Sequence, residues 1–377
     1  MPPRYYHDTG DRHLIDLIPS SPTDLYVSDE DETFYAKEDG AYITTNRVPR
    51  RIQRHIPIYL FLLLTLWVSW RTILGPRYAA HRQLIKEMDT VPQSQYGANM
   101  RPEFKDMIMV QKLDTKLLPQ EHHRLVFVGD VHGCIDELKA LLEQVDFREG
   151  KDHLVLLGDI ISKGPDSPGV VSFAKKIGAS CVRGNHEDKV LLSIAEMEAR
   201  HEPLPGPNED PSRSVDNLDE ESFSQGDYKT RKLAKQFSKG EIEWLRTLPV
   251  ILHIGQVNGV GDMVAVHAGL VPGVPLDRQD PFQVMNMRTI NLKTRMPSET
   301  RDHTPWEQFW NHQQKKQKKS DRTTVVYGHD RKRGLSIEKY SKGLDSGCVS
   351  GGRLTAMVID KDGKEKFVHV KCKGYVD

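Results

Sequence analysis

Short apolar runs alternate with amphipathic segments along the chain from about residue 121 onward. The runs Leu125 to Val128 and Leu154 to Leu157 are continuous and short, which is typical of buried strands. Between them, apolar residues recur every third or fourth position from Ile135 to Val145, which predicts one face of a helix. This order of strand, helix and strand predicts an α/β domain built from βαβ units.

The same alternation continues toward the C-terminus. Pro168 opens a helix that we expect to run through Ile177, and the next strand is expected around Cys181 and Val182, followed by a helix from near Glu187. Residues 200 to 230 are polar and rich in proline, which predicts an exposed insertion. Further strands are predicted at Met263 to Val266 and Thr323 to Tyr327, with a hairpin formed by Leu354 to Ile359 and Lys366 to Val370 around Asp362-Gly363.

Metal-binding side chains follow directly on five of these apolar runs, each after a glycine or another small residue. Strands that end in such donors bring them to one edge of a sheet, where α/β proteins bind their ligands. Carboxylate, amide and imidazole donors together suit two divalent ions and metal-assisted hydrolysis of a phosphoryl bond. The donors are Asp130 and His132, Asp159, Asn185 and His186, His267, and His329.

Each of these short motifs means little alone, but their order along the chain is specific. Gly-Asp-Val-His-Gly, Gly-Asp, Gly-Asn-His-Glu, Val-His-Ala-Gly and Tyr-Gly-His follow one another between about residues 124 and 360. The set resembles the calcineurin-like metallophosphoesterases, in the branch of the phosphoprotein phosphatases and the symmetrical diadenosine tetraphosphatases. The resemblance implies an α/β sandwich of two mixed β-sheets flanked by helices.

The resemblance also implies roles for the donors. Zinc is the leading metal, although manganese, cobalt and iron use the same donor types. The residue that follows the asparagine ligand, His186, would protonate the leaving oxygen. The implied ligands are Asp130 and His132 on one ion, Asn185, His267 and His329 on the other, and Asp159 between them.

One departure from the family pattern bears on the substrate. Phosphoprotein phosphatases carry Asp-Arg-Gly after the bridging aspartate, where this chain has Ser162, Lys163 and Gly164. Ser162 offers no carboxylate to orient and charge the catalytic histidine. A phosphate leaves far more easily than a serine alkoxide, so the substitution favours cleavage of a phosphoanhydride over a phosphoester.

Basic residues suggest how a phosphorylated substrate is held. Arg183 and Arg288 match positions where relatives hold phosphate oxygens, and Lys163 offers a third positive charge. A cationic run from Lys315 to Arg322, joined by residues 331 to 333, is read either as a solvated insertion or as a surface that attracts a long polyanion.

A charge-free apolar stretch from Ile56 to Trp70, which continues past Arg71 to Leu74, precedes this domain. Its length of about nineteen residues is close to that needed to cross a bilayer, and arginines from position 47 to 54 precede it. We therefore expect a single-pass membrane protein with a cytosolic N-terminus and a luminal catalytic domain. The predicted division is a disordered acidic tail (1–55), a transmembrane signal anchor (56–75), a juxtamembrane stem (76–120) and the catalytic domain (121–377).

The composition adds few constraints. Lys and Arg (53) balance Asp and Glu (53), so any preference for a polyanion must come from a local patch, and we expect no nucleic acid partner. Four cysteines are too few and too scattered for a disulfide scaffold, and they leave their own pairing and the redox compartment open.

The anchor, the Ser-Lys-Gly variant and the basic segment together are similar to the fungal vacuolar endopolyphosphatases. That resemblance implies hydrolysis of inorganic polyphosphate at internal anhydride bonds, by a protein of the vacuole membrane. The alternatives are a serine/threonine phosphoprotein phosphatase, a diadenosine tetraphosphatase, and a membrane scaffold that has lost catalysis. The oligomeric state is open.

Overall fold

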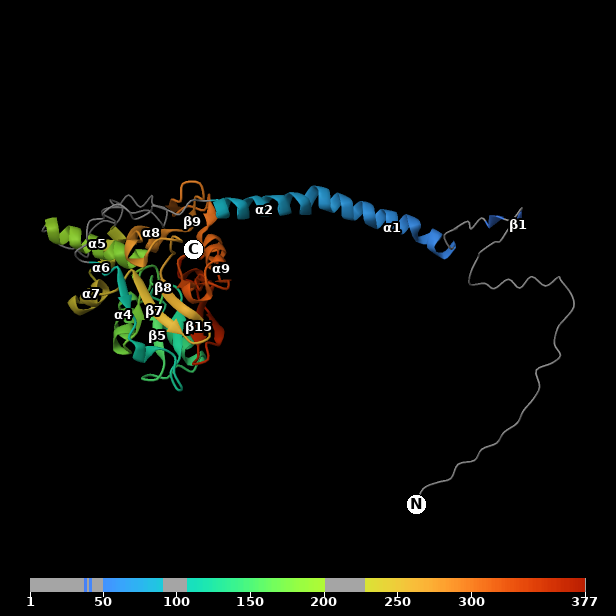
Figure 1. Ribbon diagram of the computed structural model, residues 1–377. Coiled ribbons are helices and arrows are strands. Elements are labelled where there is room, and N and C mark those ends of the chain that lie inside the picture. Colours follow the sequence, from blue (N-terminus) through green and yellow to red (C-terminus); the bar gives the residue numbers. More distant parts are fainter. Residues whose placement is uncertain (1–36, 39–40, 43–49, 91–106, 201–227, 377) are drawn as a thin grey trace, which may run out of the picture. The chain divides into compact units, whose positions relative to one another are not determined.

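The computed structural model divides into two units, Met1–Arg82 and Gln83–Asp377 (Figure 1). The structure describes residues 37–38, 41–42, 50–90, 107–200 and 228–376. Most of the predicted acidic tail and nearly all of the predicted insertion at 200 to 230 lie outside these residues. The division of the chain at residues 55, 75 and 120 remains a prediction.

The apolar stretch of the first unit is helical. Helix α1 (Arg50–Ser69) continues through a π-helical turn (Trp70–Leu74) into α2 (Gly75–Thr90), and a short pair of strands, β1 (Lys37–Glu38) and β2 (Ala41–Tyr42), precedes it. The side chains of Leu60 and Phe61 are 60% and 64% exposed. By length and composition, one helix in the described part of the chain, His55–Asp89, could cross a membrane.

The second unit contains two large mixed sheets. The first has the order β16-β15-β4-β5-β6 and the second the order β13-β14-β12-β8-β7-β3. The first sheet consists of β4 (Leu125–Val128), β5 (His153–Leu156), β6 (Ser180–Cys181), β15 (Arg353–Ile359) and β16 (Glu365–Lys371). The second consists of β3 (Val110–Lys112), β7 (Ile251–Val257), β8 (Gly261–Val266), β12 (Thr323–Tyr327), β13 (Ser336–Ile337) and β14 (Ser341–Gly343).

Helices lie on both sides of the strands in Figure 1. The α-helices of this unit are α3 (Ile135–Gln144), α4 (Ser167–Lys176), α5 (Asn185–Arg200), α6 (Tyr228–Ala234), α7 (Lys239–Arg246), α8 (Pro281–Asn286) and α9 (Trp306–Lys316). A small sheet of β9 (Thr289–Ile290), β10 (Pro297–Ser298) and β11 (Thr304–Pro305) precedes α9.

The direction in which successive strand residues point explains the layers. In β4, Leu125 and Phe127 belong to a core shared with β7, β8 and β12, whereas Val126 and Val128 belong to a core shared with α3 and α4. Successive side chains of a strand point to opposite faces, so one face of each sheet packs on the other sheet and the second face packs on helices. The predicted sandwich of two mixed β-sheets flanked by helices is confirmed.

A disulfide joins two of the four cysteines, whose pairing could not be predicted from the sequence. Cys348 and Cys372 are linked with an Sγ–Sγ distance of 2.09 Å, while Cys134 and Cys181 are buried free thiols. Cys348 opens the short helix η6 (Cys348–Ser350), and Cys372 follows the end of β16. The bond therefore ties the segment before β15 to the last strand.

We expect reduction of this disulfide to destabilise the protein. A cross-link across a sequence separation of 24 removes loop entropy from the unfolded chain worth about 3 kcal/mol. Thermal unfolding of the full chain with and without reductant measures the loss. The control is the double variant Cys348→Ser, Cys372→Ser, whose melting temperature should be low and indifferent to reductant. A wild-type protein that is equally indifferent would contradict the prediction.

Candidate active site

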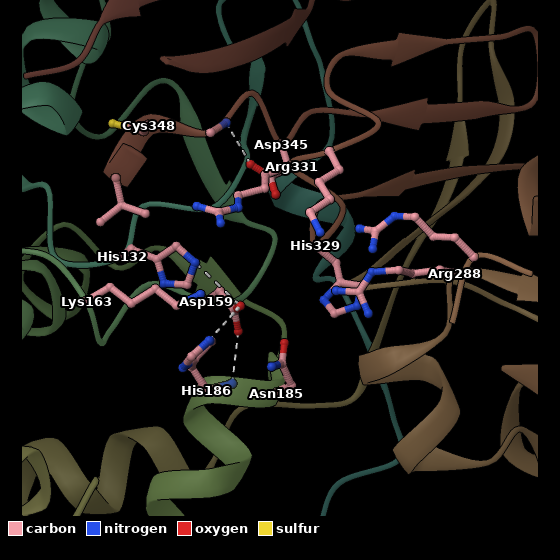
Figure 2. Close-up of a pocket in the computed structure, with 14 residues that line it drawn as sticks. His132, Asp159, Lys163, Asn185, His186, Arg288, His329, Arg331, Asp345 and Cys348 are labelled. Atoms are coloured by element: carbon pink, nitrogen blue, oxygen red, sulfur yellow. Dashed lines mark hydrogen bonds and ion pairs between the residues drawn. The ribbon is translucent and has the colours of Figure 1, made fainter. Parts of the chain in front are cut away.

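The ends of five strands bring the predicted donors together. Asp130 and His132 follow β4, Asp159 follows β5, and Asn185 and His186 begin α5 after β6. From the other sheet, His267 follows β8 and His329 follows β12. Donors from both sheets thus meet at one edge of the sandwich, around Asp159 (Figure 2).

Backbone carbonyl groups orient the imidazoles. A carbonyl oxygen only accepts hydrogen bonds, so the ring nitrogen that faces it carries the proton and the other nitrogen offers a lone pair. The three pairs are His132 Nδ1 with Ile161 O at 3.0 Å, His267 Nδ1 with Leu157 O at 2.8 Å, and His329 Nε2 with Asn286 O at 3.0 Å. The lone pairs of His267 and His329 then face each other, with Nε2 and Nδ1 3.2 Å apart.

Asp159 occupies the centre of the donors. Its Oδ2 lies 3.3 Å from Nε2 of His267 and 3.7 Å from Nε2 of His132. Two groups of donor atoms, each within 4.8 Å of one another, share it: one with His132 and His186, the other with His267 and His329. A carboxylate common to two neighbouring groups can hold two ions and offset their repulsion.

The electrostatics of the site fit cations. Burial, followed by the charges of Asp345 and Asp159, raises the pKa of Asp130 well above its usual range. Burial opposes a charge on His267, but the carboxylates of Asp159 and Asp130 outweigh it and raise its pKa to about 10, so its Nε2 takes up a proton where no other cation uses that lone pair. The buried carboxylates of Asp130, Asp159 and Asp345 lie close together, and the imidazoles of His267 and His329 face each other; both arrangements are stabilised by a cation bound between the groups. Two divalent ions therefore suit the donors present.

The remaining two predicted ligands also reach the site. The Oδ1 atom of Asn185 lies 2.9 Å from Nε2 of His267. Asp130 Oδ1 accepts the backbone N–H of His329 at 2.9 Å, and its Oδ2 lies 3.9 Å from Nε2 of His132. The structure thus brings all six predicted ligands together, although their role as ligands remains a prediction.

Three of these residues have unusual backbone conformations. His132, Asp159 and His329 have φ of 47°, 48° and 71°, in the left-handed region that residues with a side chain seldom adopt. Such backbone strain is concentrated at functional sites, where the surrounding structure maintains it. The strained positions coincide with the donors that the sequence singled out.

His186 lies beside the donors as well. Its Nε2 is 3.9 Å from Asp159 Oδ2, and its ring centroid is 5.0 Å from that of His132. Burial, followed by the charge of the neighbouring Lys163, lowers the pKa of His186 well below its usual value, which works against the protonated form that the predicted acid role requires. The position suits a ligand as well as the predicted acid, and the acid role remains a prediction.

The predicted phosphate-binding residues divide into two sets. Lys163 and Arg288 line a pocket of about 320 Å³ over the donors, and Figure 2 shows them on opposite sides of it. Among the described residues, Arg183 is not part of this lining. Its guanidinium is buried, with Nε 3.2 Å from Oδ1 of Asp188. The structure therefore brings Lys163 and Arg288 to the pocket and pairs Arg183 with Asp188, while phosphate binding by these residues remains a prediction.

The structure separates the cationic run from Lys315 to Arg322 from the basic residues 331 to 333 that were expected to join it. Lys315 to Lys319 are exposed at the end of α9 and just beyond it, outside the described lining of the pocket. Arg331 and Lys332 do line the pocket, together with Arg301 and Asp345. Neither Arg301 nor Asp345 is among the site residues predicted from the sequence.

Glu187 is a site residue whose role the sequence did not reveal. It is fully buried, and its carboxylate accepts the backbone N–H groups of Asp159 (2.8 Å), Ile160 (2.9 Å), Ile161 (3.2 Å) and Gly184 (2.9 Å). These N–H groups belong to the segments that carry two of the donors. Glu187 therefore positions the donor segments without being a ligand itself.

We expect Glu187→Gln to weaken metal binding and activity by about 10- to 100-fold, as is typical when a residue that supports metal ligands is changed. The glutamine amide presents its own N–H groups where a carboxylate oxygen accepted hydrogen bonds. Some of the buried backbone N–H groups that donate to Glu187 would therefore lose their acceptor. Zinc titration and kcat/KM measure the effect. Glu198→Gln, on the exposed face of the same helix, is the matched control. Wild-type zinc affinity in Glu187→Gln would refute this role.

The fold and the site together define a metal-dependent phosphoesterase of the two-sheet type. The chain belongs to the calcineurin-like phosphoesterase family, whose model matches residues 123–354. It is therefore a phosphohydrolase, and the family uses a dinuclear metal site. The predicted resemblance is confirmed.

Individual relatives narrow the comparison. The chain is 29% identical over 270 residues to the zinc-dependent endopolyphosphatase of Saccharomyces cerevisiae, covering 66% of this chain and 80% of that protein. It is 30% identical to a symmetrical bis(5'-nucleosyl)-tetraphosphatase of Aromatoleum aromaticum, covering 62% and 92%. A crystal structure described as a candidate diadenosine tetraphosphatase matches with a TM-score of 0.52 and 31% identity, covering 70% of this chain and 97% of the other.

Proposed function

We propose that this protein is a membrane-anchored phosphohydrolase that cleaves internal phosphoanhydride bonds of inorganic polyphosphate, using two divalent ions with zinc as the leading candidate. Bound ions supply Lewis-acid chemistry and neutralise charge at phosphorus. The chain's own part is to hold them through the six donors and to bind the substrate's oxygens through Lys163 and Arg288. His186 lines the same pocket, and we assign it the protonation of the leaving phosphate, which requires that the negative charge of the bound substrate offset the lowering of its pKa by burial and Lys163.

The observation that carries the proposal is the lining of the pocket. Five cationic side chains surround the donors, against the two carboxylates of Asp159 and Asp345. None of the described lining residues is a Trp, Tyr or Phe on which a nucleobase could stack. A lining of this kind suits a substrate made of phosphate groups better than it suits a dinucleoside.

The loop after Asp159 disfavours a phosphoprotein substrate. Ser162 and Lys163 stand where the phosphoprotein phosphatases have an acid and an arginine, and Lys163 faces the pocket. Without that acid, His186 has little help in protonating an alkoxide, whereas a leaving phosphate needs little. The similarity to a zinc-dependent endopolyphosphatase agrees with this choice of substrate and metal.

Two further observations support the membrane anchor and the luminal catalytic domain, respectively. The apolar side chains of α1 are exposed, as expected for a helix that lipid covers. The disulfide Cys348–Cys372 is of a kind that persists in oxidising compartments and is rare in the cytosol. We propose that α1 anchors the protein in the vacuole membrane with its N-terminus in the cytosol.

One experiment separates the candidate substrates. Full-length protein in detergent, stripped with chelator and reloaded with zinc, manganese or cobalt, is incubated with long-chain polyphosphate, diadenosine tetraphosphate and a phosphoserine peptide. The proposal expects polyphosphate chains of intermediate length on a gel. Release of phosphate without such intermediates would indicate cleavage from the ends. Preference for the dinucleotide or the peptide would overturn the substrate, and inactivity on all three would favour the scaffold.

A further inference from the structure

Three cations of the pocket form one wall that the sequence did not predict as a unit. Arg331 and Lys332 belong to the turn after β12, and Arg301 comes from the segment between β10 and β11. Residues of the η6 segment, including Val349, line the pocket with them. Segments far apart in the chain therefore present positive charge to the same space.

Hydrogen bonds hold the two arginines of this wall in place. Asp330, which is buried, accepts from Arg301 at 2.5 Å between Oδ1 and Nη2, and its Oδ2 lies 3.3 Å from Nε of Arg333. Arg331 donates to the hydroxyl of Ser350 in η6. Arginines fixed in this way lose less side-chain entropy when they bind an anion than solvated arginines do.

The other two cations of the pocket, Lys163 and Arg288, lie beside the metal donors, and Arg288 borders the wall, since its Nε is 4.0 Å from the Asp330 Oδ1 that binds Arg301. Figure 2 shows Lys163 beside His132 and Arg288 beside His329, and both line the pocket. A single phosphate at the donors would engage them, and a substrate with more phosphates would extend onto other charges of the pocket.

We propose that Arg301, Arg331 and Lys332 form a subsite for the phosphate units next to the scissile bond of a polyphosphate chain. The inference rests on the proposed function and deepens it, because it names the residues that favour long chains over short phosphate esters. Charges along such a wall attract each successive unit of a polyanion and help to fix its path across the donors. A substrate with one phosphate would gain little from them.

The double variant Arg331→Gln, Lys332→Gln tests the subsite. We expect KM for long-chain polyphosphate to rise about tenfold, equivalent to roughly 0.7 kcal/mol for each of two partly exposed contacts, with kcat nearly unchanged. The kcat/KM for p-nitrophenyl phosphate should stay within about twofold of wild type. The rise of KM with salt should become shallower, since fewer counterions exchange on binding.

The matched control removes the same charge elsewhere. Lys318 and Lys319 are exposed and lie outside the described lining, so Lys318→Gln, Lys319→Gln should keep the wild-type KM and salt dependence. Equal losses in both double variants would overturn the subsite in favour of a general charge effect. An equal loss on p-nitrophenyl phosphate would overturn it in favour of damage to the donors.

A binding measurement separates the subsite from the proposed function. Metal-stripped full-length protein is titrated with fluorescently labelled polyphosphate, and the pocket variant should bind about tenfold more weakly than wild type and the control. If wild type cleaves polyphosphate but all three proteins bind alike, the subsite is wrong and the function stands. If wild type fails to cleave polyphosphate, the function is wrong, and the same titration still decides whether the wall binds the chain.

Discussion

Asp159→Asn is expected to abolish activity, with kcat/KM falling by about 10³-fold or more. The exchange keeps the size of the side chain but removes the charge that both groups of donors share. It also leaves His267, whose side chain is fully buried, without the carboxylate that lies 3.3 Å away. A loss of about 4 kcal/mol in transition-state stabilisation corresponds to this fall in rate. Steady-state kinetics and elemental analysis of the purified protein measure activity and bound metal together.

Asp136→Asn is the control for this variant, because Asp136 is exposed in the first turn of α3 and the exchange makes the same change in charge. It should keep both metal and activity. If Asp159→Asn kept two equivalents of metal and near-wild-type rates, Asp159 would not be the shared ligand. A variant that failed to fold would be recognised by its circular dichroism and melting temperature.

The sandwich could be predicted because its strands carry strong local signals. The run at β4 is apolar throughout, and the run at β12 is β-branched and aromatic (Thr-Thr-Val-Val-Tyr); each is followed by a glycine and then a metal-binding residue, so consecutive residues predict both the strand and its chemistry. β7 was not predicted, because His253 and Gln256 interrupt its apolar pattern on a strand with a register shift between His253 and Gly255. Tertiary pairing with β8 supplies what the local pattern lacks.

Contacts between segments that are far apart in the chain could not be predicted from the sequence. Glu187 stands beside two predicted site residues, yet its function depends on four N–H groups that only the folded chain brings to it. The disulfide likewise depends on the approach of η6 to the end of β16. Arg183 shows the opposite case: its place in the motif suggested phosphate binding, whereas folding pairs it with Asp188.

Gly184→Ala is expected to reduce activity by about 100-fold. Gly184 precedes Asn185, and its tight surroundings explain why the motif needs so small a residue there. A Cβ at Gly184 would lie 2.3 Å from Oδ1 and 2.4 Å from the backbone N of Asp159, and 2.7 Å from Oε2 of Glu187. The segment that carries Asp159 would have to move, and with it the donor that both groups share. Steric strain of this size in a packed site costs about 1–3 kcal/mol of stability as well.

Gly240→Ala is the matched control, since a Cβ there would meet its nearest neighbour among the described residues outside its own helix, Nζ of Lys175, at an ordinary 3.5 Å. Gly240 lies in α7, where alanine is the better helix former, so this variant should be as active as wild type and at least as stable. Kinetics, zinc titration and melting temperature of the two variants provide the comparison. Full activity in Gly184→Ala would mean that the segments of Asp159 and Asn185 are not packed against each other as tightly as the donor geometry requires.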